Sequence, residues 1–229
     1  MQQLPLGVRL RERASFETFV AGDNVQLVTR LRALATAGAG RVWISGSTGT
    51  GRTHLLQAVL ALAASAGRRV AYLPLAQVPT IDAALLDGFG DFDLVCLDDL
   101  ERAVGNLALE RALFSLTRRF EAEGRALLVT ADQPPATLCW TLPDIGSRWA
   151  AAEVFQVVAL DEAGQAEVLR KRALARGLDL PDETLRFLQR RFPRDVAALC
   201  DLLERIDVAA LSAQRRLTVP FVRQALGEP

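Results

Sequence analysis

The sequence has too few metal-binding and disulfide-forming residues for several classes of protein. Its 229 residues include only three cysteines, which are far apart and odd in number, and a single histidine. The small number and wide spacing of these residues argue against a disulfide framework and against a cysteine–histidine metal site. They favour free thiols in a reducing cytosol. With no second histidine as a partner, His54 fits a packing or surface role better than a catalytic one.

Long apolar runs and an excess of one charge are also missing. The first residues contain no apolar run of signal-peptide length, and no stretch approaches the roughly 18 apolar residues of a membrane span. We therefore expect a cytoplasmic protein with no membrane partner. Basic and acidic residues number 27 each, so the net charge is zero. A protein whose main task is to coat nucleic acid would be basic, and that class is disfavoured.

One stretch predicts a phosphate-binding loop. A strand-like segment at 41–45 leads into Gly46-Ser47-Thr48-Gly49-Thr50-Gly51-Arg52-Thr53, and an apolar helix-like segment follows. The glycines allow backbone angles closed to other residues, so that N–H groups and the helix N-terminus can point at anionic oxygens. We expect this loop to bind ADP or ATP, with the Thr53 hydroxyl on Mg²⁺. The alternative is a glycine-rich turn that binds nothing.

Arg52 stands where this motif has a lysine. Arginine keeps the positive charge but replaces a compact ammonium with a longer planar fork, which changes the fit to a β/γ-phosphate pair. Lys171 is the only lysine among the 27 basic residues. Arg52 can therefore also reflect a general preference of the chain for arginine.

Acidic residues follow two later strand-like segments. Asp98 and Asp99 end the run at 94–97, and Asp132 follows the run at 126–130. The carboxyl ends of parallel strands meet at one sheet edge, so these side chains would face a γ-phosphate if the fourth strand lies between the first and third. Asp98 would then hold Mg²⁺ through water, and Asp99 would polarise the attacking water. For Asp132 the alternative is an ordinary turn cap.

Two further motifs have a functional and a purely structural interpretation. Phe16 and Phe19 precede a Gly-Asp-Asn turn, where the two rings can flank an adenine base or belong to the core. Arg148 follows Gly-Ser in an expected loop at the sheet edge, from which it can reach a neighbouring subunit's nucleotide. The alternative for Arg148 is an ordinary surface arginine.

The pattern as a whole predicts an α/β fold followed by helices. Residues 14–159 form the expected nucleotide-binding domain, a P-loop parallel five-stranded sheet flanked by helices. Within it we expect strands at 41–45, 69–73, 94–97, 126–130 and 154–158, a helix-like segment at 75–86 and a helix at 105–123. Residues 160–229 form an expected all-α lid, with helices at 162–176, 181–191, 194–210 and 218–226.

Both ends of the chain carry candidate binding residues. Arg194 opens one of the expected lid helices, from which it can reach back to the nucleotide. Residues 1–13 have no helical or long strand period and predict a flexible tail. In this tail Gln3, Leu4 and Leu6 can dock into a partner's pocket, and the alternative is a frayed terminus.

Five features in this order resemble the AAA+ module of the DnaA/Hda family. They are the loop 46–53, the acidic strand end 98–99, Thr-Ala-Asp-Gln-Pro-Pro at 130–135, Gly-Ser-Arg at 146–148 and Arg-Asp-Val-Ala-Ala-Leu at 194–199. The resemblance also takes in residues 16–24 and so covers nearly the whole chain. It implies a nucleotide clasp containing Phe16 and Phe19, a Walker A loop with Thr53, Asp98 as Walker B, Asp132 as sensor 1, Arg148 as an arginine finger and Arg194 as sensor 2.

The sequence departs from the initiator pattern in three respects, and with these departures it resembles the regulatory inactivators within this family. No helix-turn-helix reader domain follows the lid, Arg52 replaces the lysine, and Gln3-Leu4-Pro5-Leu6 is similar to the Gln-Leu-x-Leu peptide that docks on the replicative sliding clamp. Gly7 stands where that peptide commonly has an aromatic residue. The resemblance implies a negative regulator of replication initiation that stimulates ATP hydrolysis by DnaA on the DNA-loaded clamp.

Several questions stay open at this stage. The sequence does not distinguish ADP from ATP, and it allows a homo-oligomer and DNA contact through the clamp complex. One alternative is a stand-alone AAA+ ATPase, such as a helicase loader or clamp loader subunit. Another is an initiator relic that only binds DNA, which the neutral charge and the missing reader domain disfavour.

Overall fold

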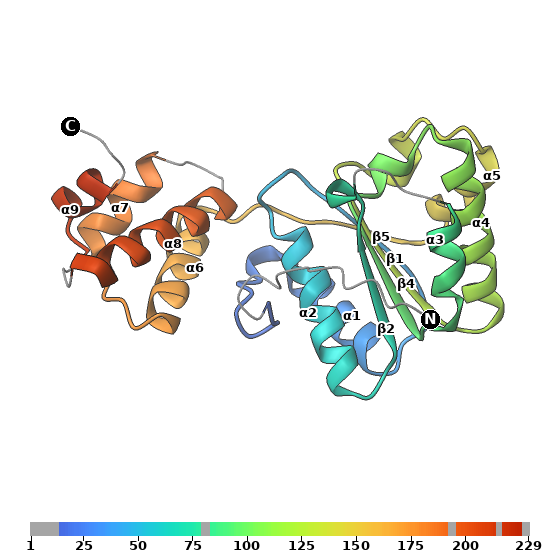
Figure 1. Cartoon of the computed structure of the whole chain (residues 1–229), viewed down its shortest axis with the longest axis horizontal. Helices are drawn as coiled ribbons and strands as arrows, with labels where there is room; N and C mark the ends of the chain where they lie inside the picture. The colour runs from blue at the N-terminus through green and yellow to red at the C-terminus, as the bar shows by residue number, and fades with distance from the viewer. Residues whose placement is uncertain (1–13, 79–82, 192–195, 214–216, 226–229) are drawn as a thin grey trace.

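The computed structural model describes residues 14–78, 83–191, 196–213 and 217–225. They form an α/β domain and a smaller C-terminal helical domain joined by one extended segment (Figure 1). The predicted α/β fold with a helical lid is confirmed. The expected tail 1–13 lies outside the described residues.

The five strands form one parallel sheet in the order β2-β3-β4-β1-β5. Their bounds are β1 Gly40–Ser45, β2 Val70–Pro74, β3 Leu94–Asp98, β4 Ala126–Ala131 and β5 Glu153–Gln156. Each predicted strand is present, although β5 is shorter than expected. β4 lies between β1 and β3, as the predicted site required, so the loop after β1 and the acidic ends of β3 and β4 share one edge of the sheet.

Helices cover both faces of the sheet because successive strand side chains point to opposite sides. α1 (Val25–Thr36) and α2 (Arg52–Ser65) pack on one face, where they share a core with Val42 and Ile44. α4 (Leu107–Ala122) and α5 (Pro143–Ala150) cover the other face, and the intervening residue Trp43 is buried there. Figure 1 shows the sheet between these two layers.

The segment after β2 differs from the helix expected over 75–86. Its described parts are short turns, namely η2 Leu75–Gln77, α3 Ala84–Asp87 and η3 Gly88–Asp91. Pro79 accounts for the break, because a proline disfavours the helical conformation of the residue before it. Val78 is accordingly extended, with φ −98° and ψ 110°. The other short turns are η1 Gly22–Asn24, η4 Leu100–Ala103 and η5 Pro135–Thr137.

A fully buried carboxylate fixes the approach to α5. Glu110, in the first turn of α4, accepts hydrogen bonds from the backbone N–H groups of Gly105, Thr141 and Leu142 at 2.8, 3.1 and 2.7 Å. A buried charge is tolerated when such donors surround it. Glu110 therefore joins the start of α4 to the loop that leads into α5.

Replacing Glu110 with alanine should destabilise the domain. Three backbone donors would lose their acceptor, and the free energy of unfolding should fall by about 1–3 kcal/mol. Chemical denaturation would measure this loss, with Glu123→Ala, an exposed glutamate at the C-cap of the same helix, as the control. Equal stability of Glu110→Ala and the parent protein would show that these hydrogen bonds contribute nothing.

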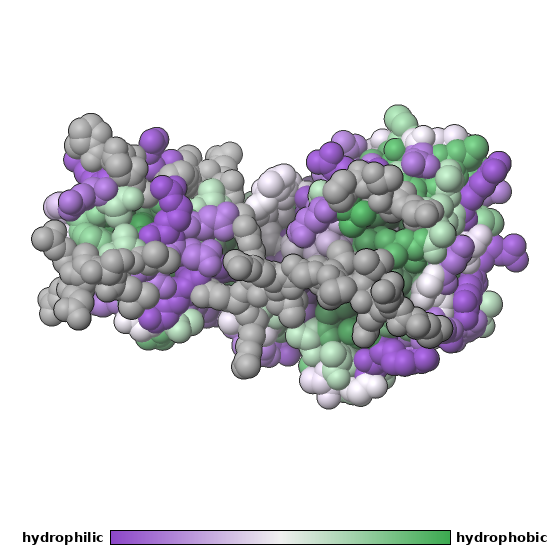
Figure 2. Space-filling model, in the orientation of Figure 1, coloured by the Kyte–Doolittle hydropathy of each residue, from purple (hydrophilic) through white to green (hydrophobic). Residues whose placement is uncertain are grey.

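The C-terminal domain has a core of its own. Its helices are α6 Glu162–Ala175, α7 Asp182–Arg191, α8 Val196–Ala213 and α9 Val219–Ala225, close to the predicted ones. Leu169, Leu188, Leu203 and Val222 meet in its centre with no exposed surface. Over the ranges that the structure describes, no helix has both the length and the apolarity for a membrane span. Figure 2 shows the two domains as separate lobes with a waist between them.

Candidate functional site

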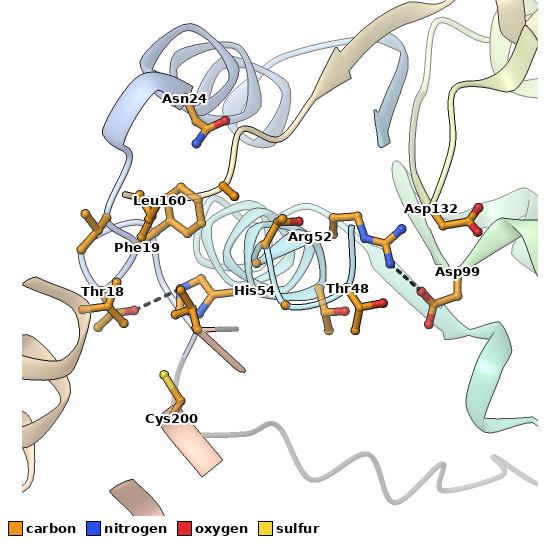
Figure 3. Close-up of a pocket in the computed structure, with 18 of the residues that line it drawn as sticks. Thr18, Phe19, Asn24, Thr48, Arg52, His54, Asp99, Asp132, Leu160 and Cys200 are labelled. Atoms are coloured by element: carbon orange, nitrogen blue, oxygen red, sulfur yellow. Dashed lines mark hydrogen bonds and ion pairs between the residues drawn. The ribbon is translucent and has the colours of Figure 1, made fainter. Parts of the chain in front are cut away.

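A cavity of about 580 Å³ lies between the strand ends of the sheet and the helical domain. Arg52, Asp99 and Asp132 line one end, and Phe19 and Leu160 line another part of the wall (Figure 3). The helical domain closes it with Val168, Arg172, Val196 and Cys200. The cavity is therefore polar beside the sheet and largely apolar where the two domains meet.

The predicted phosphate loop forms part of the cavity wall. Gly49 and Gly51 adopt left-handed backbone angles, with φ of 83° and 96°. A Cβ at Gly51 would lie 3.0 Å from the ring of Phe19, so a side chain there would meet both strain and a clash. No side chain caps the N-terminus of α2, which begins at Arg52. An uncapped helix start behind a glycine turn is a suitable place for an anion.

Arg52 is buried at the phosphate-loop end of the cavity, and one of its N–H donor groups has no hydrogen-bond partner. Only 9 % of the residue is exposed, and its Nη2 lies 3.6 Å from Oδ1 of Asp99. Its Nη1 is buried and has no hydrogen-bond partner in the structure. A buried guanidinium donor without an acceptor is unfavourable in an empty protein, and a phosphate oxygen would satisfy it. This orphaned donor fits an anionic ligand.

The two acidic residues after β3 occupy different positions. Asp98 is 2 % exposed, accepts hydrogen bonds from the hydroxyls of Tyr72 (3.0 Å) and Thr130, and does not line the cavity. Asp99 lines the cavity, and its N–H donates to Thr130 at 3.0 Å. Asp99 is therefore the residue of this pair that faces a ligand, whereas Asp98 anchors the strand end behind it.

The surroundings of Asp99 shift this residue toward its neutral, protonated form. Burial raises the pKa of Asp99, the charge of Asp98 raises it further, and Arg52 and Arg102 act against this shift. Burial also raises the pKa of Glu101, whose Oε2 is buried with no hydrogen-bond partner. Sequence analysis missed Glu101, because it lies past the strand end on η4 and belongs to no motif.

The two aromatic candidates separate in the structure. Phe19 lines the cavity, but Phe16 is 6 % exposed and belongs to the core beneath α1. The guanidinium of Arg32 covers the Phe16 ring at 4.7 Å from its centroid. The core interpretation therefore holds for Phe16, and only Phe19 is placed to contact a ligand.

His54, on the P-loop helix α2, forms hydrogen bonds with the segment that precedes α1. Its Nε2 lies 3.0 Å from the Ser15 carbonyl oxygen and 3.2 Å from the Thr18 hydroxyl. The carbonyl can only accept, so Nε2 carries the proton and donates to it. Burial lowers the pKa of His54, which favours the neutral ring. The only histidine thus has a packing role at the cavity wall (Figure 3).

The structure corrects the predicted surroundings of Arg148. This residue lies in helix α5 and not in a loop, because Pro143 starts a helix whose Ile145 and Trp149, one turn apart, are buried together. Its guanidinium pairs with Glu121 and stacks over the Phe114 ring, 5.3 Å from the centroid.

Arg148 does not belong to the wall of the described cavity. The same Glu121 also pairs with Arg41 at 2.7 Å, and Arg41 donates to the carbonyl oxygen of Arg148 at 2.9 Å. Arg148 is thus held at a separate place by residues of α4 and β1.

The remaining sequence candidates fall into two groups. Six residues of the predicted loop line the cavity, namely Thr48, Gly49, Thr50, Gly51, Arg52 and Thr53. Gly46 and Ser47, the first two residues of that loop, are not part of the cavity wall. Arg194 and the tail residues Gln3, Leu4 and Leu6 lie outside the described residues. Sequence analysis did not find the lid contribution of Val168, Arg172 and Cys200, because only the packing of the two domains brings these residues to the cavity.

Comparisons with known proteins point to one family. The family model of the bacterial DnaA ATPase domain matches residues 10–151, and the model "Hda, lid domain" matches residues 161–226. An uncharacterized protein of Haemophilus influenzae is 37 % identical over 227 residues, which is 98 % of each chain.

Solved structures share the fold at low sequence identity. Domain III of the replication initiation protein DnaA from Thermotoga maritima has a TM-score of 0.83 and 20 % identity, over 95 % of this chain and 97 % of that one. AMPPCP-bound DnaA from Aquifex aeolicus has a TM-score of 0.72 and 21 % identity, over 89 % of this chain and 68 % of that one. The ATPase-domain model covers more than half of the sequence, and the lid model follows it, so the chain belongs to the DnaA/Hda family of AAA+ proteins.

Proposed function

We propose that this protein is a nucleotide-bound negative regulator of replication initiation. It docks on the DNA-loaded sliding clamp and stimulates ATP hydrolysis by the initiator DnaA. One observation carries the proposal: the chain has a cavity suited to its own nucleotide, while Arg148 lies outside that cavity. An arginine that does not serve its own nucleotide is available for a partner's.

The proposed ligand of the cavity is ADP or ATP. The orphaned Nη1 of Arg52 and the uncapped start of α2 suit the phosphates, and Phe19 with Leu160 suits the base. A related DnaA was solved with AMPPCP, an ATP analogue. Mg²⁺ would neutralise phosphate charge, and Thr53 on the cavity wall would be its protein ligand. Asp98 does not line the cavity and could contribute to the metal only through water. In the described part of the chain no cluster of three or more metal-binding side chains exists, so the metal would depend on the phosphates.

Replacing Arg52 with alanine should weaken ADP and ATP binding by about 10- to 100-fold, because a charge-assisted hydrogen bond to phosphate is lost. The fold should persist, since among the described residues Arg52 makes one ion pair, with Asp99, and no hydrogen bond that joins two elements. Calorimetric titration measures the affinity. The Arg102→Ala variant, also on the cavity wall but without the orphaned donor, gives the comparison. Unchanged titrations for Arg52→Ala would remove the phosphate assignment.

Arg52→Lys tests why an arginine stands here. If the longer fork crowds the γ-phosphate region, lysine should shift the preference toward ATP. An unaltered ratio of ADP to ATP affinity would show that the arginine reflects only the composition of the chain.

A stand-alone AAA+ ATPase is the second candidate function. The carboxylates of Asp99, Glu101 and Asp132 all line the cavity and could activate water at a bound ATP. A helicase loader or clamp loader subunit would use its site in this way. The same carboxylates suit a regulator that hydrolyses its nucleotide slowly and then stays in the ADP form.

Phosphate release distinguishes the two functions. The protein alone, DnaA alone, and both together with clamp loaded on DNA would be compared at equal ATP. A regulator gives slow release alone and a rate in the mixture well above the sum of the two. Brisk release by the protein alone with a purely additive mixture would establish the ATPase. DNA contact through the clamp and self-association can be followed in the same mixture by varying the DNA and the protein concentration.

A further inference from the structure

We propose that Arg172, on the first helix of the lid, binds the phosphate chain of the nucleotide from the side opposite the P-loop. This inference rests on the nucleotide-binding part of the proposed function and adds a second cationic contact to it. Arg172 belongs to none of the motifs found in the sequence.

The position of Arg172 on α6 is the first support. Val168 and Arg172 are four residues apart, and both line the cavity, so one face of α6 is turned toward the ligand. Val168 is 7 % exposed and clusters with Val20 and Cys200 at the apolar part of the wall. The charged end of this face is thus one helical turn away from the apolar part.

The cavity wall to which Arg172 belongs also includes the start of the P-loop helix. This start is the first turn of α2, which begins at Arg52. Phosphates are expected at that turn, because its N–H groups are uncapped. Thr53 and His54 of the turn line the same cavity as Arg172.

Arg172 also differs from the other cations of its helix in having no acidic partner among the described residues. Arg170 pairs with Asp182 at 2.8 Å and Lys171 with Glu167 at 2.9 Å. Arg176 lies 3.6 Å from Asp207. A half-buried guanidinium beside a cavity, with its neighbours all paired, is left for an anionic ligand.

The arrangement has a consequence for the two domains. A phosphate chain held by Arg52 from the sheet and by Arg172 from the lid would bridge the domains across the cavity. The lid would then close more firmly on a bound nucleotide than on the empty site.

Arg172→Ala in the full chain tests the proposal, with Arg170→Ala on the same helix as the control. ADP, ATP and adenosine are titrated into each protein by calorimetry, and thermal unfolding is recorded with and without ADP. Arg172→Ala should weaken ADP and ATP about tenfold, leave adenosine affinity unchanged and reduce the ADP-induced rise in Tm. Its Tm without ligand should match the parent's, and Arg172→Lys should recover part of the affinity.

Two results would overturn the assignment. Parent-like ADP affinity in Arg172→Ala would show that the side chain does not reach the phosphates. An equal loss of adenosine and ADP affinity would place Arg172 at the base or in the shape of the pocket. If the parent protein bound none of the three ligands, the nucleotide part of the proposed function would fall as well, and that result is distinguishable from the other two.

Discussion

Replacing Arg148 with alanine is expected to lower the stimulated rate of ATP hydrolysis by DnaA by about 10³-fold or more, the range in which arginine fingers act. A guanidinium neutralises charge that develops on the γ-phosphate oxygens in the transition state, and alanine offers no replacement. The protein's own nucleotide affinity should be unchanged, because Arg148 does not line its cavity. Single-turnover phosphate release and a separate ADP titration would measure the two effects.

The Glu121 ion pair sharpens this test. In the structure Glu121 holds both Arg148 and Arg41, so a partner's phosphates must compete with this carboxylate for the guanidinium. Glu121→Gln keeps the size of the side chain but removes the competing charge. A faster stimulated rate in this variant would show that the Glu121–Arg148 ion pair restrains Arg148, and a slower rate would show that the ion pair positions Arg148 for the partner's phosphates. Arg118→Ala, an exposed arginine on the same helix α4, is the control for a general loss of surface charge.

Two outcomes would contradict the role in trans. Normal stimulation by Arg148→Ala would return the residue to an ordinary surface arginine. Loss of the protein's own nucleotide affinity in the same variant would show that Arg148 acts on its own site.

The double substitution Gln3→Ala with Leu4→Ala is expected to weaken binding to the sliding clamp by about 100-fold or more. An extended docking peptide concentrates its affinity in a few side-chain pockets, and removal of two anchors leaves little of it. The tail itself lies outside the described residues, but the chain that follows it is firmly placed. Ala14 is buried, and the Ser15 carbonyl accepts a hydrogen bond from His54.

The control for the tail is Arg11→Ala with Arg13→Ala, which removes two charges from the same segment but leaves the peptide intact. Surface plasmon resonance on immobilised clamp measures retention, and an ADP titration shows that the cavity is unaffected. Retention that survives the Gln3 and Leu4 substitutions would refute the peptide. Equal losses in both double variants would indicate charge attraction instead of pocket docking.

The sequence was a good guide where local pattern decides the structure. Buried parallel strands need continuous apolar runs, so β1, β3 and β4 could be located from them, and the order of motifs placed Asp99 and Asp132 at the ligand edge. The lid helices lie close to their predicted bounds, and in the structure the Asp161 side chain caps the first of them by accepting from the N–H of Gly164 at 2.8 Å.

It was a poor guide where packing between distant segments decides the structure. Phe16 and Phe19 look alike in sequence, and only the position of α1 buries one and leaves the other at the cavity. Arg148 was expected in a loop because the burial of Ile145 and Trp149 on one short helical face was not recognised. Arg172 is one of several basic residues on α6, and the contact between the domains distinguishes it from the others.

The most direct test of the proposed function is to determine which protein's bound ATP is hydrolysed. DnaA is loaded with γ-labelled ATP, this protein is loaded with unlabelled ADP, and labelled phosphate is followed in a single turnover after the two are mixed with clamp on DNA. Every labelled phosphate in this design comes from ATP that was bound to DnaA. We expect rapid release of labelled phosphate, and we expect this release to require the clamp, the tail peptide and Arg148. Release at the rate of DnaA alone, with all components present and the protein bound to the clamp, would contradict the account.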